Sequence, residues 1–208
     1  EMAIGLRVIT QKGGQRIIRA AFEHAQKFGY PKVTLVEKPN VLRETSGLMI
    51  QEGKRVASEF PGIKLEMTNI DAQMMWLLKN PRDYGVLVTS NLFGDILSDL
   101  ASQLVGGLGF ACSGNLGDRF AVFEPVHGSA PKYAGLYKVN PMAMLLAVKM
   151  MLDWLQEKEK AAALESAIAA VIAEGRVRTY DMGGARSTLE MARAVVQKIM
   201  NFSNTLAL

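Results

Sequence analysis

Along the first half of the chain, segments with apolar residues at helical spacing alternate with short apolar runs typical of strands. Residues 15–28 carry apolar side chains at helical spacing, and Gly29 ends the helix that they predict. The β-branched run 33–36 predicts a buried strand, and residues 46–60 predict a second helix ended by Pro61. The same reasoning predicts strands at 63–68 and 86–89, helices at 72–78, 95–104, 142–156, 160–174 and 188–199, and a frayed tail at 201–208. Strands that alternate with helices in this way indicate an α/β fold.

An irregular segment, residues 106–141, separates the strand-containing part of the chain from a helix-rich part. It is rich in Gly, Ser, Asn and Pro. Long irregular segments are uncommon in compact domains and are usually functional, so we expect binding residues in this one. No GxGxxG motif follows a predicted strand, and the phosphate-binding loop of a Rossmann fold is therefore not predicted.

Composition and charge narrow the class of protein. Hydrophobic residues make up 49% of the 208 residues and charged residues 21%, which excludes a disordered or collagen-like chain. The 24 Lys and Arg against 20 Asp and Glu give a net charge of +4, too mild to indicate a nucleic-acid partner. The most apolar stretch, 142–155, is too short to span a bilayer and contains Lys149 and Asp153, so no membrane partner is expected. The single Cys112 cannot form an intramolecular disulfide and fits a reducing, cytoplasmic location.

Asp95 and Asp99 are the first candidates for chemistry, because residues four apart on a helix point the same way. Like charges at this spacing repel each other, and a hard divalent cation such as Mg²⁺ or Mn²⁺ would remove the repulsion. The spacing alone favours the ordinary alternative, in which Asp95 lies in the first helical turn and Asp99 on a solvated face. Asp71 lies where a predicted strand gives way to a helix, and by itself it is more typical of an N-cap than of a metal ligand.

Lys38 follows a predicted buried strand, at the end where α/β sheets form their sites. A lysine at that end can bind a carboxylate or take part in proton transfer. The ordinary alternative is a surface lysine paired with Glu37, and composition alone favours it.

Residues 124–141 concentrate small residues together with a histidine and two lysines. Small residues let backbone N–H groups approach an anion, a histidine or asparagine can hydrogen-bond the edge of a heterocycle, and a lysine can meet a phosphate. The candidates for these roles are, in turn, Gly128, Ser129 and Ala130, then His127 and Asn140, and finally Lys132. The alternatives are an ordinary surface loop with solvated lysines and, for Asn140, the cap of the helix that follows.

Five motifs in this chain resemble, in order, those of the β-decarboxylating isocitrate/3-isopropylmalate dehydrogenase family. Each is weak alone, but together they are highly specific and cover nearly the whole chain. The motifs are VEKPNV (36–41), NIDAQMM (69–75), NLFGDILSDLAS (91–102), EPVHGSAPKYAG (124–135) and VNP (139–141). The resemblance implies the isopropylmalate dehydrogenase-like α/β fold, which is not the Rossmann fold.

The resemblance implies specific roles for the acidic residues and the lysine. Family members oxidise a 2-hydroxy acid with NAD or NADP and release a β-carboxylate as CO₂, with Mg²⁺ or Mn²⁺ as Lewis acid. Asp95 and Asp99 match the metal ligands of one subunit, and Asp71 matches the ligand given across the interface of a homodimer. Lys38 matches a catalytic lysine, also given across the interface, that takes part in proton transfer, and Asn40 matches a residue beside the substrate and the nicotinamide ribose. The catalytic candidates are therefore Lys38, Asp71 and Asn40, in active sites shared by two subunits.

The resemblance also indicates which dinucleotide is used. NAD-preferring members tend to carry an Asp after the SAP triplet, where this chain has Lys132 and then Tyr133, as in NADP-dependent isocitrate dehydrogenases. A lysine attracts a 2′-phosphate that an Asp would repel. The arginine of bacterial NADP enzymes would fall at Gly184, so NAD stays possible. The cofactor-binding candidates are Glu124, His127, Gly128, Ser129, Ala130, Lys132, Tyr133, Val139, Asn140 and Tyr180.

Residue 1 is Glu, and the resemblance begins after roughly the family's first third, so we expect the C-terminal part of a longer enzyme. Residues 1–105 would belong to the small, dimerisation domain and residues 106–208 to the large, cofactor-binding domain. The arginines that clamp the substrate and the catalytic tyrosine would lie in the missing part. We expect isocitrate and NADP, with 3-isopropylmalate, homoisocitrate or tartrate and NAD as alternatives within the family. A non-catalytic fragment or subunit is the other alternative, and the 208 residues alone are expected to be inactive.

Overall fold

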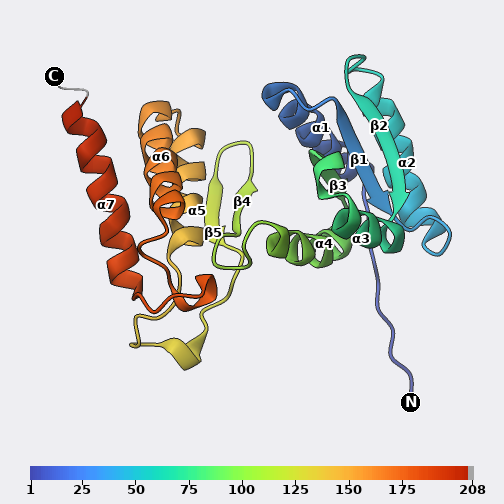
Figure 1. Ribbon diagram of the computed structural model, residues 1–208. Coiled ribbons are helices and arrows are strands. Elements are labelled where there is room, and N and C mark those ends of the chain that lie inside the picture. The colour runs from blue at the N-terminus through green and yellow to red at the C-terminus, as the bar shows by residue number, and fades with distance from the viewer. Residues whose placement is uncertain (206–208) are drawn as a thin grey trace. The chain divides into compact units, whose positions relative to one another are not determined.

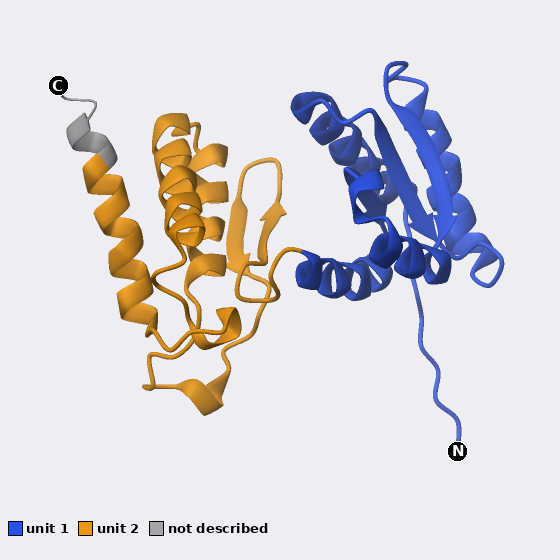
Figure 2. Cartoon of the chain, viewed as in Figure 1, with its two compact units in different colours: residues 1–104 blue, residues 105–208 orange. Residues whose placement is uncertain are grey.

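The chain forms two compact units, Glu1–Leu104 and Val105–Leu208 (Figure 2). The structure, a computed structural model, describes the backbone of residues 1–205 and the side chains of residues 1–201. Each unit has a hydrophobic core of its own. These units are defined by packing alone, so the assignment of a dimerisation domain and a cofactor-binding domain stays a prediction.

A parallel sheet of three strands, in the order β2-β1-β3, forms the centre of the first unit (Figure 1). The strands are β1 (Lys32–Glu37), β2 (Lys64–Asn69) and β3 (Val86–Thr89). The central strand β1 is buried from Val33 to Glu37, as expected for an apolar strand covered on both faces. Because the strands are parallel, their carboxyl ends share one edge, where Glu37 lies opposite Asn69. Side chains that follow these ends are therefore brought together.

Four helices cover the two faces of this sheet. They are α1 (Gln11–Phe28), α2 (Arg43–Ala57), α3 (Ile70–Lys79) and α4 (Asn91–Leu104). Helices α1 and α2 pack with Val33 and Leu35 into one core, whereas α3 and α4 pack with Val36 into another. Successive side chains of a strand point to opposite faces, which explains why neighbouring residues of β1 join different cores.

All four helices of the first unit have boundaries that differ from those that the sequence pattern predicts, and α3 spans Ile70–Lys79 rather than 72–78. Helix α1 begins at Gln11 rather than at residue 15, because the Thr10 hydroxyl caps it by accepting a hydrogen bond from the Gly13 N–H at 3.1 Å. Helix α2 spans Arg43–Ala57 rather than 46–60. Helix α4 begins at Asn91 rather than at residue 95. The sequence pattern misses its first turn because that turn contains a glycine, which disfavours a helix by propensity alone.

The second unit combines three helices with a two-stranded antiparallel hairpin (Figure 1). The helices are α5 (Met142–Trp154), α6 (Lys158–Glu174) and α7 (Thr188–Thr205), and the strands are β4 (Cys112–Leu116) and β5 (Ala121–Pro125). Met142, Ile168 and Met191 are among the buried residues that hold the helices together. Helix α7 continues to Thr205, so the expectation of a frayed tail is wrong as far as that residue, and residues 206–208 lie outside the described part.

The hairpin lies within the segment that the sequence analysis expects to be irregular, and that expectation is wrong for residues 112–125. Strand β4 reads CSGNL, which has little intrinsic β-propensity. Pairing and packing supply what propensity lacks, because Ser113 lies opposite Glu124 and the hairpin packs against α5. The described residues also form three short 3-10 helices: η1 (Pro81–Asp83), η2 (Pro131–Tyr133) and η3 (Tyr180–Met182).

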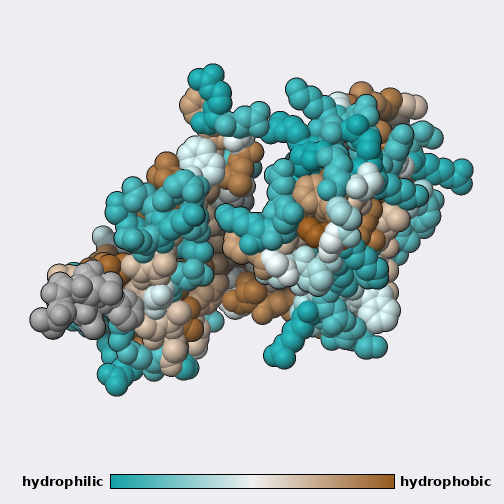
Figure 3. All heavy atoms as spheres, turned by 90° about the horizontal axis from the view of Figure 1, so that it is seen from above, coloured by the Kyte–Doolittle hydropathy of each residue, from teal (hydrophilic) through white to brown (hydrophobic). Residues whose placement is uncertain are grey.

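Apolar side chains lie among polar ones on the face seen in Figure 3. In the first unit, large exposed apolar residues are concentrated on α3 and α4, where they include Met75, Trp76, Leu78, Leu92 and Ile96. None of the helices in the part that the structure describes is long and apolar enough to cross a membrane.

Candidate active site

Lys38 and Asp71 meet at the carboxyl edge of the parallel sheet. Lys38 directly follows β1, and Asp71 is the second residue of α3, which directly follows β2. The Lys38 ammonium donates a hydrogen bond to the Asp71 carboxylate. This bond, opposed by some desolvation, lowers the pKa of Asp71 from its ordinary value. The alternative of a Lys38–Glu37 pair is therefore wrong, because the lysine reaches across to the neighbouring strand.

Asp71 does not cap its helix, contrary to the interpretation that its position alone favours. The N-cap of α3 is Asn69, and Asp71 lies in the first turn. The helix dipole favours a carboxylate there. Its side chain is 64% exposed, against 21% for Lys38, so the acid faces solvent while the lysine is partly covered. Asp71 is thus accessible to a ligand or a second chain.

Asp95 and Asp99 are exposed on α4, one turn apart. Because α4 begins at Asn91, Asp95 lies beyond the first turn. The alternative in which the helix dipole stabilises Asp95 in the first turn is therefore wrong. Within the described residues, no group of three or more His, Cys, Asp or Glu side chains is arranged to hold a metal ion. Asp71 therefore does not join Asp95 and Asp99 in such a group within one chain. The two carboxylates themselves are the hard oxygen donors that Mg²⁺ and Mn²⁺ take.

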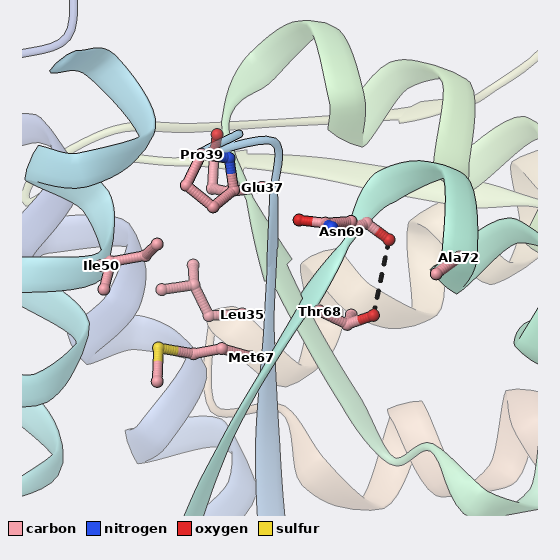
Figure 4. A pocket seen from close by; sticks show the side chains of 8 residues that line it. All are labelled: Leu35, Glu37, Pro39, Ile50, Met67, Thr68, Asn69 and Ala72. Atoms are coloured by element: carbon pink, nitrogen blue, oxygen red, sulfur yellow. Dashed lines mark hydrogen bonds between the residues drawn. The ribbon is translucent and has the colours of Figure 1, made fainter. Parts of the chain in front are cut away.

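Asn40 lies in the turn between β1 and α2, and its side chain is exposed. Two hydrogen bonds to the Lys38 carbonyl, from Val41 N–H at 3.1 Å and Leu42 N–H at 2.8 Å, close this turn. A pocket of about 350 Å³ adjoins it, between α2 and the ends of β1 and β2 (Figure 4). The turn thus keeps Asn40 near Lys38 along the chain.

Glu37, the last residue of β1, is a buried carboxylate that the sequence analysis did not single out. It is 1% exposed, and it accepts hydrogen bonds from the Ser46 hydroxyl at 2.7 Å and the Ser90 N–H at 3.0 Å. The Arg7 guanidinium lies 3.6 Å from the same carboxylate. The signal in the sequence was a charged residue at the end of a strand predicted to be buried. A buried charge requires hydrogen-bonding or ionic partners.

In the second unit, the loop that follows β5 holds several of the cofactor-binding candidates. His127 is half-buried, and its Nδ1 lies 2.9 Å from the Gly128 carbonyl oxygen. Gly128 and Ser129 are exposed, and Ala130 has a left-handed backbone with φ of 44°. Glu124 is exposed on β5 and accepts a hydrogen bond from the Asn115 amide at 3.0 Å. The loop backbone is thus open to a ligand.

Two tyrosines and two lysines of the second unit form a cationic aromatic cluster. The rings of Tyr133 and Tyr180 have centroids 5.6 Å apart. Lys132 Nζ lies 5.0 Å from the Tyr133 ring, and Lys138 Nζ lies 5.0 Å from the Tyr180 ring. A hydrogen bond between the phenols lowers the pKa of Tyr133 and raises that of Tyr180. The sequence analysis named three members of this cluster as candidates and missed Lys138, which lies outside the motifs.

Val139 and Asn140 connect this cluster to the helices. The Val139 carbonyl accepts a hydrogen bond from Thr188 Oγ1 at 2.5 Å. Asn140 is buried, and its Oδ1 accepts from the Met142 N–H at 3.0 Å while its Nδ2 donates to Asp181 at 2.9 Å. The N-cap of α5 is Pro141, so the alternative of Asn140 as the cap is wrong, although Asn140 does bond the first N–H of the helix. A cofactor role for Asn140 stays a prediction, but its polar groups already have partners.

Gly184 stands where a bacterial NADP enzyme would carry an arginine, and the backbone around it is crowded. A Cβ atom at this position would lie 2.1 Å from the Arg178 carbonyl oxygen. No side chain fits there unless the backbone moves. A pocket of about 410 Å³ next to it is lined by Lys138, Tyr180 and Arg186, among others. Positive charge at this place therefore comes from lysines and Arg186.

Comparison with known proteins identifies the family. Residues 1–195 match the family described as isocitrate/isopropylmalate dehydrogenase. The 3-isopropylmalate dehydrogenase of Methanothermobacter thermautotrophicus is 46% identical over 199 residues, which are 96% of this chain and 60% of that protein. The isocitrate/homoisocitrate dehydrogenase of Thermus thermophilus is 47% identical over 201 residues, which are 96% of this chain and 59% of that protein.

The solved structures agree. The crystal structure of isocitrate dehydrogenase from Methylococcus capsulatus matches with a TM-score of 0.90 and 44% identity, covering 93% of this chain and 58% of that one. This confirms the fold that the sequence predicts. The chain spans about 60% of the length of the curated relatives it matches. It belongs to the isocitrate/isopropylmalate dehydrogenase family.

Proposed function

We propose that this chain is part of a metal-dependent dehydrogenase that oxidises a 2-hydroxy acid and releases its β-carboxylate as CO₂. The observation that carries the proposal is the contact of Lys38 with Asp71 at the carboxyl edge of the sheet. A partly covered ammonium beside an exposed carboxylate can hold or deliver a proton at Nζ while the carboxylate remains charged. Asn40, which lies in the turn directly after Lys38, would hydrogen-bond the substrate or the nicotinamide ribose.

The carboxylates of Asp95 and Asp99, together with Asp71 of a second copy, would hold a Mg²⁺ or Mn²⁺ ion. Such an ion would supply Lewis-acid polarisation of the substrate hydroxyl and stabilisation of the enolate left by decarboxylation. The proposal fits the exposure of all three side chains and their separation into two groups within one chain. It makes a homodimer necessary for activity, because each site would draw residues from both copies.

The tyrosine–lysine cluster supports NADP as the cofactor. Lys132 and Lys138 place positive charge beside two phenol rings, a setting that suits a 2′-phosphate. The open loop at His127, Gly128, Ser129 and Ala130 would receive the adenosine part through backbone N–H groups. NAD is the alternative, since Gly184 leaves no room for the additional arginine.

Isocitrate is the proposed substrate, because NADP use is commoner among the isocitrate enzymes of this family. A second candidate is 3-isopropylmalate, homoisocitrate or tartrate with NAD. The names of two relatives about equally similar to this chain contain the first two of these acids, and one of the names contains isocitrate as well. The third is a non-catalytic fragment or subunit. Retention of Lys38, Asp71, Asp95 and Asp99 argues against it.

The deciding experiment assays the full-length protein with Mn²⁺ against isocitrate, homoisocitrate, 3-isopropylmalate and tartrate, each with NADP and NAD. We expect fastest turnover with isocitrate and NADP. Faster turnover of 3-isopropylmalate with NAD would reject the substrate and cofactor and keep the reaction class. No turnover of any acid would reject the enzyme. The 208-residue chain, assayed in parallel, is expected to be inactive, and NADPH production by it would contradict that expectation.

A further inference from the structure

We infer that Glu37 is a positioning residue that fixes the catalytic lysine and the metal-binding helix α4 relative to each other, an inference that rests on the proposed function. Glu37 contacts neither a substrate nor a metal ion in this account. Its carboxylate instead joins the end of β1 to the first turn of α2, where Ser46 lies, and to the junction of β3 with α4, which is distant in sequence.

The first connection runs to Lys38. The Ser46 hydroxyl donates to the Glu37 carboxylate at 2.7 Å and accepts from the Lys38 N–H at 3.3 Å. Ser46 is fully buried, so bulk water does not compete for either of these two hydrogen bonds. The N–H group of the lysine is therefore held to α2 through the Ser46 hydroxyl, whose orientation Glu37 sets.

The second connection runs to α4. The Ser90 N–H donates to the other carboxylate oxygen of Glu37 at 3.0 Å, and the Ser90 carbonyl accepts from the Gly94 N–H of α4 at 2.9 Å. Ser90 is thus the residue from which α4 starts, and Asp95 follows Gly94 directly. A displacement of Ser90 would move the start of the helix that carries Asp95 and Asp99.

Arg7 completes this buried arrangement. Its guanidinium donates to the Ser90 hydroxyl, lies 3.6 Å from the Glu37 carboxylate and stacks over the Phe93 ring at 4.6 Å. A buried carboxylate with two hydrogen bonds and a cation nearby has a defined geometry. Reacting groups tolerate little displacement. Lys38 and α4 of one copy would serve different sites of the proposed dimer, so the loss of this arrangement in both copies should affect the lysine and the metal-binding residues of every site.

Glu52 offers a matched control in the same unit. It is also 1% exposed and accepts two hydrogen bonds, from Gln11 and Arg55, each at 2.9 Å. It lies in α2, and neither of these two donors belongs to the turn that holds Lys38 or to the segment from Ser90 into α4. Glu37→Ala leaves the buried donors of Ser46 and Ser90 unpaired, whereas the donors to Glu52, Gln11 and Arg55, are exposed to water. Glu52→Ala therefore controls for the loss of a buried carboxylate in the same unit.

The test uses the full-length protein with the variants Glu37→Ala, Ser46→Ala and Glu52→Ala. We expect Glu37→Ala to lower kcat about 100-fold and to weaken Mn²⁺ binding, measured by electron paramagnetic resonance without substrate, about 10-fold. Ser46→Ala removes the hydroxyl that links Glu37 to the Lys38 N–H and keeps the hydrogen bond from Ser90 to Glu37, so it should lower kcat and leave Mn²⁺ binding unchanged. Glu52→Ala should leave both unchanged. If Glu37→Ala does not fold, Ser46→Ala still tests the connection to the lysine.

Hydrogen exchange separates this inference from the proposed function. The amides of Lys38 and Ser90 should exchange faster in Glu37→Ala than in Glu52→Ala, whether or not the protein is an enzyme. Faster exchange with no turnover in the unmodified protein would reject the proposed function and retain the structural role of Glu37. Equal exchange, equal kcat and equal Mn²⁺ binding in the two glutamate variants would overturn the inference.

Discussion

The Lys38 ammonium donates a hydrogen bond to the Asp71 carboxylate across the carboxyl edge of β1 and β2. Neither residue is near the other in sequence, and parallel pairing of the two strands brings them together. Because the lysine stabilises the charged form of the acid, it lowers the pKa of Asp71. A carboxylate that stays charged is suited to a cation.

Removal of the lysine charge should raise the pKa of Asp71. In the native protein the pKa is lowered, so the pair stabilises the fold above the ordinary pKa of an aspartate and loses this effect as the pH falls through the lowered value. In Lys38→Met we expect the pKa of Asp71 to return toward its ordinary range, measured by NMR titration of the carboxyl carbon. Lys158→Met, at an exposed position of α6, is the control. An unchanged titration of Asp71 in Lys38→Met would contradict the pairing.

Lys132→Asp should shift cofactor preference from NADP toward NAD. The substitution places a carboxylate beside Tyr133, where it would repel a 2′-phosphate. We expect the ratio of kcat/KM for NADP over NAD to fall about 10- to 100-fold, corresponding to the ~1.5–3 kcal/mol of a hydrogen bond to a charged group. Steady-state kinetics of the full-length protein measure it, with Lys158→Asp as a charge-matched control. The same fall in both variants would show a general electrostatic effect and contradict a specific role for Lys132.

The second unit should lose stability in acid because Glu190 becomes protonated there. It forms a reciprocal cap at the start of α7 with Ser187, whose N–H and hydroxyl each donate to its carboxylate at 2.8 Å, and Arg186 donates at 2.8 Å as well. These bonds, the backbone N–H first, lower the pKa of Glu190 from 4.5 to about 2. Its contribution to stability is therefore complete above pH 4.5 and is lost as the pH falls toward about 2.

Glu190→Gln tests this cap. The variant should have a lower Tm than the unmodified chain at pH 7, and the difference should shrink as the pH is lowered below 4.5. Thermal unfolding followed by circular dichroism at several pH values measures it. Glu159→Gln, in the first turn of α6, is the control. A difference in Tm that stays constant with pH would contradict the effect of the Glu190 charge.

The sequence predicts most of the fold well, for identifiable reasons. Strong periodicity predicts the sheet of the first unit and the long helices, and motif order predicts the family. The sequence does not predict the hairpin β4–β5, because CSGNL becomes a strand through packing against α5 rather than through its own propensity. Glu37 escapes because its partners, Ser46 and Ser90, are scattered along the chain and only tertiary structure brings them together.

The proposed metal site is the part that a single chain leaves incomplete. Asp95 and Asp99 share a helix, which their spacing predicts, but Asp71 does not join them among the residues that the structure describes. The proposed function therefore depends on a second copy that supplies Lys38 and Asp71 to the site of the first. Which copy supplies each residue is a property that kinetics can test.

Co-expression of Lys38→Met with Asp95→Asn in the full-length protein tests this claim most directly. Each variant alone should be inactive. In a mixed dimer with shared sites, one site carries both substitutions and the other carries neither, so purified mixed dimers should recover about half of the unmodified turnover. If Lys38 and Asp95 of the same copy served the same site, every site would carry one substitution. Mixed dimers without activity, beside active unmodified dimers, would contradict the shared site.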